Sequence, residues 1–281
     1  METITLNNGV KMPQLGYGVY QVEPAEAERC VSDALSVGYR MVDTAQAYRN
    51  EEGVGAAVKK SGLKRDEVFI VSKVWISNYG YERARASIDD SLKCLQTDYI
   101  DLMLLHQPFC DYYGAYRALE EAYHAGKLRA IGVRNFQPNH FIDLASNVEV
   151  VPAVNQVETH VFYQQICAKK YMDEFDTKIM SWGPLAEGRN GLFTNPTLAE
   201  IGQAHGRSVA QVALRYLTQR GVIIIPKSVR RERMAENFQI YDFKLTPDEM
   251  ARIERLDTAH SLFFDHNDPE TVKMFMGWRS L

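Results

Sequence analysis

The chain has 281 residues, of which 46% are hydrophobic and 24% are charged, and its formal net charge is −4. This composition is typical of a globular protein that buries a large core, and the charge gives no electrostatic reason to expect a nucleic acid or an acidic membrane as a partner. No uninterrupted apolar run approaches the roughly 18 residues that a membrane span needs, and residues 1–6 do not resemble a secretion signal, so we expect a cytoplasmic protein.

Strands and helices are predicted to alternate along the chain. The Asn8-Gly9 pair predicts a hairpin with a two-residue turn near the start. Apolar runs then predict eight strands, at residues 15–19, 39–43, 68–73, 100–106, 130–133, 153–158, 179–182 and 222–226. Helical spacing predicts the intervening helices, at residues 24–37, 51–60, 81–95, 112–125, 138–146, 164–175, 196–219 and 231–238. Capping signals mark further helix starts at Ser208 and Thr246.

The predicted strands have the character of a buried parallel sheet. Residues 222–225, for example, are apolar without alternation, as a strand covered on both faces requires. Units of this kind build either a closed barrel or an open, doubly wound sheet. Eight strand–helix units favour closure, and about 250 residues are enough for it. The sequence therefore predicts a single α/β domain over residues 1–281, an (α/β)8 TIM barrel preceded by an N-terminal β-hairpin.

Three polar residues stand at the ends of successive predicted strands. Asp43, Lys73 and His106 are separated by 30 and 33 residues, the length of a strand, a helix and two loops. Taken singly, Asp43 could cap the next helix, and a histidine before a proline is often structural. Because the active sites of barrels lie at the C-terminal ends of strands, their joint placement predicts that the three side chains face one another in a functional site.

An acid, a lysine, a histidine and the nearby Tyr48 suit proton transfer. A tyrosine is a weak acid, with a reference pKa of about 10, but a neighbouring ammonium such as that of Lys73 lowers it. Asp43 would hold Lys73 charged, while His106 donates a hydrogen bond to a carbonyl oxygen. This set fits hydride addition to a carbonyl, with Tyr48 as the proton donor. The hydride must come from a cofactor, because no amino acid supplies one.

The cofactor signal lies after the last predicted strand. Gly16-Tyr17-Gly18 lacks the third glycine of a standard dinucleotide fingerprint, and the sequence contains no Walker pattern. It also contains no metal-binding motif, so no metal is expected. Instead, Lys227, Ser228 and Arg233 form a basic cluster at a strand-to-helix turn, the favoured phosphate site of a barrel. A solvated basic helix is the alternative interpretation.

These residues resemble the signatures of the aldo-keto reductase superfamily over essentially the whole chain. The resemblance rests on Asp43-Thr44-Ala45 with Tyr48, Lys73, His106-x-Pro108 and Ile225-Pro226-Lys227-Ser228, in the family's order and spacing. The hairpin and the tail at residues 261–266, expected to form a C-terminal loop over the barrel mouth, look like the bacterial branch similar to 2,5-diketo-D-gluconic acid reductases.

The resemblance implies an NADPH-dependent enzyme that reduces aldehydes and ketones to alcohols. It implies that Tyr48 is the acid, that Asp43 and Lys73 tune it, and that His106 orients the carbonyl. The cofactor-binding residues that it implies are Asn135 and Gln156 at the carboxamide, Trp182 stacked on the nicotinamide, Gly183 and Leu185 beside the cofactor, Lys227, Ser228, Val229 and Arg233 at the 2′-phosphate, and Glu236 and Asn237 at the adenine. A monomer is the family's usual form.

Two positions depart from the family's pattern. Arg134 replaces a small hydroxyl residue in Gly132-Val133-Arg134-Asn135-Phe136, and Gly183 stands where a serine often meets the pyrophosphate. We expect Arg134 either to enter the pocket or to contact the cofactor, and to weaken nicotinamide binding.

The substrate is expected to be a small carbonyl compound. Tyr20, Trp75 and the tail around Phe264 suggest an aromatic pocket, although aromatic residues in loops also serve packing. Two other classes of function stay open. Lys73 could form a Schiff base, as in an aldolase, or the chain could bind NADPH as a sensing subunit without turnover.

Overall fold

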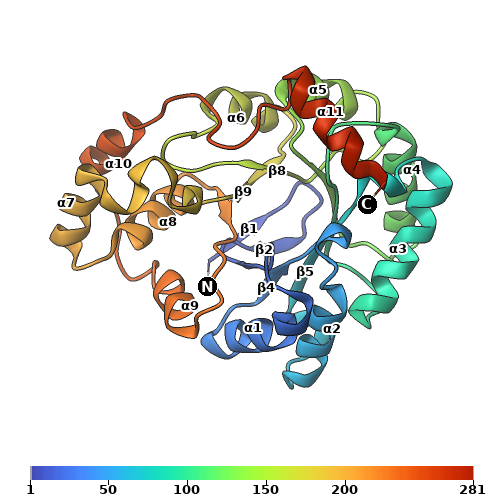
Figure 1. Cartoon of the computed structure of the whole chain (residues 1–281), viewed down its shortest axis with the longest axis horizontal. Coiled ribbons are helices and arrows are strands. Elements are labelled where there is room, and N and C mark those ends of the chain that lie inside the picture. Colours follow the sequence, from blue (N-terminus) through green and yellow to red (C-terminus); the bar gives the residue numbers. More distant parts are fainter. Residues whose placement is uncertain (1, 281) are drawn as a thin grey trace.

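A computed structural model describes residues 2–280 of the chain. Eight parallel strands lie in sequence order and form the wall of a barrel (Figure 1). They are β3 (Tyr17–Gly18), β4 (Met41–Asp43), β5 (Phe69–Val74), β6 (Leu102–Leu105), β7 (Ile131–Arg134), β8 (Val154–Glu158), β9 (Lys178–Trp182) and β10 (Ile223–Ile224). The predicted (α/β)8 fold is confirmed.

The first and last strands close the barrel. The backbone N–H of Gly16 donates to the carbonyl of Ile224 at 2.8 Å, and the N–H of Ile224 donates to the carbonyl of Gln14 at 2.9 Å. Leu15 and Ile224 thus pair in parallel just before β3. Closure leaves the sheet without an exposed edge along these residues.

Helices surround the strands, as the ring in Figure 1 shows. They are α1 (Pro24–Val37), α2 (Glu51–Lys60), α3 (Tyr81–Leu95), α4 (Tyr112–His124), α5 (Pro138–Ala145), α6 (Ile166–Asp173), α7 (Pro196–His205), α8 (Val209–Gln219), α9 (Arg231–Phe238), α10 (Pro247–Glu254) and α11 (Pro269–Gly277). None of these helices is both long and apolar enough to cross a membrane.

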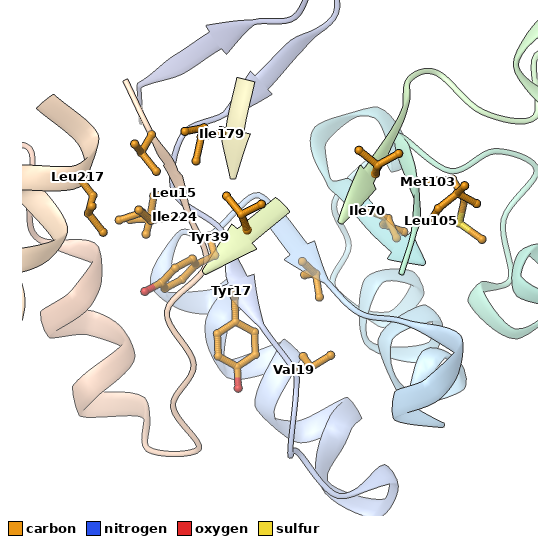
Figure 2. Close-up of a cluster of buried hydrophobic side chains, with 14 of the residues drawn as sticks. Leu15, Tyr17, Val19, Tyr39, Ile70, Met103, Leu105, Ile179, Leu217 and Ile224 are labelled. Carbon is orange, nitrogen blue, oxygen red and sulfur yellow. The ribbon is translucent and has the colours of Figure 1, made fainter. Parts of the chain in front are cut away.

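Alternating strand residues divide the core into two layers. On β6, Leu102 and Leu104 point into the barrel, while Met103 and Leu105 pack against the helices. Figure 2 shows part of the outer layer, in which Leu217 of α8 lies near strand residues such as Ile224. Because both of its faces are buried, a strand such as β6 is apolar throughout and its sequence lacks a polar face.

The N-terminal hairpin plugs the barrel. Strands β1 (Thr3–Thr5) and β2 (Lys11–Pro13) pair antiparallel, and Leu6 and Met12 join the inner core layer. The hairpin is confirmed, but its turn is longer than the predicted two residues. It runs through Asn7–Gly9 inside a Leu6–Val10 pair, with Gly9 at a φ of 84°.

Two helical predictions need correction, and one helix was missed. The region 196–219 is two helices, because Gly206 adopts a φ of 62° and Ser208 caps α8. The helix expected from residue 164 begins at Ile166, since Gln165 has a φ of 56°. The C-terminal helix α11 was not predicted at all.

Candidate functional site

A cavity of about 1010 Å³ opens at the C-terminal ends of the strands. The site residues expected from the strand ends converge on it: Asp43 ends β4, Lys73 lies one residue before the end of β5, and His106 follows β6. Parallel pairing fixes this arrangement, with Lys73 opposite Leu104 and the N–H of His106 donating to the carbonyl of Val74 at 3.1 Å. Lys73 was predicted to end its strand, which continues to Val74.

Lys73 and Asp43 form a buried ion pair. Nζ of Lys73 lies 2.7 Å from Oδ1 of Asp43 and donates a second hydrogen bond to the carbonyl of Thr44, also at 2.7 Å. The other carboxylate oxygen of Asp43 accepts from Nε2 of Gln156 at 2.8 Å. Burial lowers the pKa of Lys73 to about 8, although the Asp43 carboxylate opposes this shift. The pair is therefore held in one geometry with its charges largely offset.

Tyr48 lies directly over this pair. It ends a short 3-10 helix, η1 (Gln46–Tyr48), and Nζ of Lys73 is 4.8 Å from the centroid of its ring. The rings of Tyr48 and His106 meet edge to face, with centroids 5.7 Å apart. A cation over an aromatic face fixes the position of the ring, and hence of the hydroxyl.

The expectation that Lys73 lowers the pKa of Tyr48 is wrong for this structure. Burial raises the pKa of the Tyr48 hydroxyl well above its usual value. The positive charge that opposes the shift is the Arg134 guanidinium, while the Asp43 carboxylate adds to it. The hydroxyl accordingly keeps its proton at neutral pH.

His106 is held neutral. Burial, together with the positive charges of Arg134 and Lys73, places its pKa well below the usual range. Its ring lies against Trp75, with centroids 4.8 Å apart. Its Nδ1 atom has no hydrogen-bond partner within residues 2–280. A neutral imidazole in this position can donate one hydrogen bond without bringing a further charge into the cavity.

A chain of amide contacts crosses the cavity floor beside these residues. Nδ2 of Asn135 donates to Oε1 of Gln107 at 3.1 Å, and Nε1 of Trp182 donates to Oδ1 of Asn135 at 2.8 Å. His266, from the C-terminal tail, contacts the same Oε1 of Gln107 at 3.2 Å. The sequence analysis missed Gln107 and His266. The first occupies the unspecified position of the His106-x-Pro108 motif, and the second comes from a segment distant in sequence.

Arg134 enters the cavity, one of the two outcomes expected for it. Its Nε donates to Oε1 of Gln156 at 2.9 Å, and its guanidinium carbon lies 5.1 Å from the centroid of the Trp182 ring. Arg134, at the end of β7, therefore contacts one residue of β8 and one residue of β9.

The remaining expected residues divide into two groups. Tyr20, Trp75, Gly183, Leu185 and Lys227 line the cavity. The loop that follows Lys227 lies outside the cavity lining, with Ser228 held through its carbonyl by the Tyr17 hydroxyl at 2.6 Å. Val229, Arg233 and Glu236 also lie outside the cavity lining, where Val229 and Arg233 are exposed, and Asn237 is on the buried face of α9. Lys227, Arg230 and Arg233 form no ion pair with any residue between 2 and 280.

The C-terminal tail covers the mouth, as expected. Oε1 of Glu158, at the end of β8, accepts from the N–H of Leu262 at 2.8 Å, and Oε2 accepts from the Ser261 hydroxyl. From the opposite loop, η4 (Ala186–Thr194), Arg189 donates to the carbonyl of Leu262 at 2.6 Å. Phe263 then packs on Trp182, with ring centroids 5.1 Å apart. Two loops remote in sequence thus meet over the cavity.

Comparison with known proteins agrees with this geometry. The family model described as "Aldo/keto reductase family" matches residues 8–258. Glyoxal reductase of Bacillus subtilis is 45% identical, over 91% of this chain and 93% of its own length. Methylglyoxal reductase DkgA of Escherichia coli is 41% identical, over 92% of this chain and 94% of its own length.

Solved structures extend the likeness to the fold. An aldo-keto reductase from a Medee basin deep-sea metagenome library superposes with a TM-score of 0.92 at 38% identity, covering 94% of this chain and 98% of that one. A Bombyx mori aldo-keto reductase in complex with NADP superposes with a TM-score of 0.89 at 30% identity, covering 97% and 96%. The chain belongs to the aldo/keto reductase family, with bacterial reductases among its relatives.

Proposed function

We propose that this protein reduces aldehydes and ketones to alcohols, with NADPH as the hydride donor and Tyr48 as the proton donor. The observation that carries the proposal is the position of Tyr48. Its protonated hydroxyl lies at the cavity, its ring rests on the buried Lys73–Asp43 pair, and the neutral His106 stands beside it. A reduction of this kind needs both a hydrogen-bond donor and a proton donor near one carbonyl oxygen.

The residues present fit a nicotinamide nucleotide. Trp182 offers an aromatic face to the cavity, and the amides of Asn135 and Gln156 stand beside it. At the rim, Lys227 lines the cavity, Ser228 and Val229 follow it on the loop, and Arg233 lies in the first turn of α9; a 2′-phosphate would neutralise the positive charge of this segment. Gly183 and Leu185 would lie beside the pyrophosphate, and Glu236 and Asn237 would lie beside the adenine. When bound there, NADPH supplies the hydride.

The protein's own residues would act on the carbonyl oxygen. His106 and the Tyr48 hydroxyl hold that oxygen by hydrogen bonds, so that negative charge develops against two donors. As the charge grows, Tyr48 passes its proton to the oxygen and the alcohol forms. Lys73 keeps the ring of Tyr48 in place, and its positive charge offsets the transient phenolate. Asp43 holds Lys73 in position through the 2.7 Å contact.

Tyr20 and Trp75 would bind the substrate together with His106. Both aromatic residues line the cavity, and the ring of Tyr20 lies 5.1 Å from that of Tyr48. The names of two relatives, a glyoxal reductase and a methylglyoxal reductase, favour a small reactive carbonyl as the first substrate to try.

A Schiff-base aldolase is the weaker candidate. The lowered pKa of Lys73, about 8, would favour imine formation. Against it, Lys73 is fully buried, donates two hydrogen bonds to Asp43 and Thr44, and does not line the cavity. A sensing subunit without turnover would have no use for a proton donor placed in this way.

The test is to mix the purified protein with NADPH and methylglyoxal and to follow absorbance at the nicotinamide band. We expect NADPH oxidation by the wild type, loss of it in Tyr48→Phe, and retained NADPH binding in that variant. Tyr81→Phe, on α3 away from the cavity, is the matched control for removal of a phenolic hydroxyl. NADPH binding without turnover across a panel of aldehydes and ketones would favour the sensing subunit instead.

A further inference from the structure

Arg134 contacts two of the residues that would bind the nicotinamide in the proposed function, Gln156 and Trp182. We propose that, in the protein without cofactor, the Arg134 guanidinium occupies the place between Trp182 and Gln156 where the nicotinamide would bind. NADPH must displace the guanidinium in order to bind. This inference rests on the proposed function. It states that Arg134 lowers the affinity of the protein for the nicotinamide half of the cofactor.

Arg134 donates a hydrogen bond to Oε1 of Gln156, the acceptor that the carboxamide of a bound nicotinamide would need. Nε2 of Gln156 is already committed to Asp43, at 2.8 Å, and also lies 3.2 Å from the sulfur of Met180. Oε1 is therefore the side chain's one acceptor, and Nε of Arg134 donates to it at 2.9 Å. A carboxamide NH2 group that binds here competes directly with the guanidinium.

The contact with Trp182 uses an aromatic face at the cavity. The guanidinium carbon lies 5.1 Å from the centroid of the indole, within the range of a cation–π interaction. The indole N–H is fixed by Asn135, so the ring is not free to turn away. A flat, aromatic ligand cannot stack on the same face while the guanidinium stays there.

The guanidinium can leave without breaking the barrel. Its terminal nitrogens, Nη1 and Nη2, donate no hydrogen bond to any residue from 2 to 280, and the side chain lines the open cavity. The backbone of Arg134, by contrast, is fixed by its pairing with Gln156 across β7 and β8. Displacement is therefore a rotation of the side chain, and its cost is the loss of one charge-assisted hydrogen bond and one cation–π contact.

Shortening the side chain should remove this cost. For Arg134→Ser we expect the dissociation constant of NADPH to fall by about tenfold, since interactions of this type are worth roughly that factor. Adenosine 2′,5′-bisphosphate carries the adenosine and the 2′-phosphate but no nicotinamide. Its dissociation constant should be unchanged, because Arg134 lies in the barrel and not on the loop after Lys227.

The experiment is isothermal titration calorimetry of both nucleotides with wild type, Arg134→Ser and Arg134→Lys. The lysine variant keeps the positive charge but lacks the planar group and Nε. It therefore distinguishes two effects of Arg134: filling the place of the nicotinamide, and attracting the phosphates of the nucleotide by its charge. We expect Arg134→Lys to behave more like the serine variant than like the wild type. Unchanged binding of adenosine 2′,5′-bisphosphate also reports that each variant is folded.

Two results would overturn the inference while leaving the proposed function intact. The first is NADPH binding by Arg134→Ser that is equal to or weaker than that of the wild type, which would make Arg134 a cofactor ligand or a bystander. The second is tighter binding of both nucleotides to the same extent, which would point to a general charge effect. Failure of the wild type and both variants to bind NADPH would overturn the proposed function and this inference together.

Discussion

Lys73 and Asp43, on the neighbouring strands β5 and β4, are joined at the mouth of the barrel by a buried ion pair. Their charged atoms lie 2.7 Å apart, and their side chains are 0% and 2% exposed. A buried pair of this kind adds little stability over an apolar pair, but removing one partner leaves the other charge desolvated. The geometry of the candidate site and the stability of the fold therefore both depend on Lys73 and Asp43.

Lys73→Met should lower the free energy of unfolding by about 3–5 kcal/mol, because Asp43 would remain buried without its cation. Urea denaturation measures the change. Lys93→Met is the matched control, since Lys93 pairs with Asp90 on the surface at 75% and 71% exposure and should change little. The double variant Lys73→Met/Asp43→Asn should be more stable than Lys73→Met alone. Equal, small losses at Lys73 and Lys93 would contradict a desolvated pair.

His266 should make the protein sensitive to acid. Its ring lies against those of Phe109 and Phe275, with centroids 6.1 and 5.5 Å away. Burial, together with the charge of Arg134, lowers its pKa from 6.5 to about 4, against the opposing field of Asp265. The unfolded chain therefore binds a proton that the folded protein excludes over this range. The contribution to stability is complete above pH 6.5 and is lost as the pH falls toward about 4.

The expected loss from this histidine is about 3 kcal/mol between pH 7 and pH 4, at 1.36 kcal/mol for each pKa unit. His266→Gln keeps an amide donor for Gln107 but cannot take up the proton. The free energy of unfolding of this variant should thus fall about 3 kcal/mol less than that of the wild type over the same interval. His124→Gln, on the exposed end of α4, should follow the wild type. If His266→Gln also followed the wild type, His266 would not be the group that titrates.

Gly132 allows β7 and β8 to approach each other. A Cβ atom at this position would lie 2.3 Å from the carbonyl oxygen of Val154 and 2.9 Å from a methyl carbon of Leu104. Gly132→Ala should therefore cost about 1–3 kcal/mol of unfolding free energy, the usual penalty for overpacking a core. A Cβ atom at Gly277, in α11, would meet no atom of residues 2–280 within 4 Å, so Gly277→Ala should be neutral or slightly stabilising. Thermal unfolding of the two variants compares them, and a Gly132→Ala protein as stable as the wild type would mean that β7 can shift freely.

The local features of this chain could be predicted because they depend on neighbouring residues. Apolar runs and helical spacing identified all eight barrel strands, and the capping box at Ser208 forms as its sequence indicates. The repeat of about thirty residues placed Asp43, Lys73 and His106 at one end of the barrel, since parallel strands share their direction. Helix α11 escaped prediction, although Asp268 caps its start, because its apolar residues Phe275 and Met276 bury against distant parts of the chain.

The sequence by itself thus determined the order of the elements, the end of the barrel that carries the polar residues, and the family. Only the tertiary structure decided how these residues act on one another. Asp43 meets Gln156 across 113 residues, the barrel closes between Leu15 and Ile224, and Arg134 reaches Trp182. The pKa of Tyr48 rises because burial outweighs the positive charge of Arg134, and Lys73 is paired with Asp43. Burial and electrostatic fields are sums over groups that lie near in space and far apart in sequence, so no local pattern encodes them.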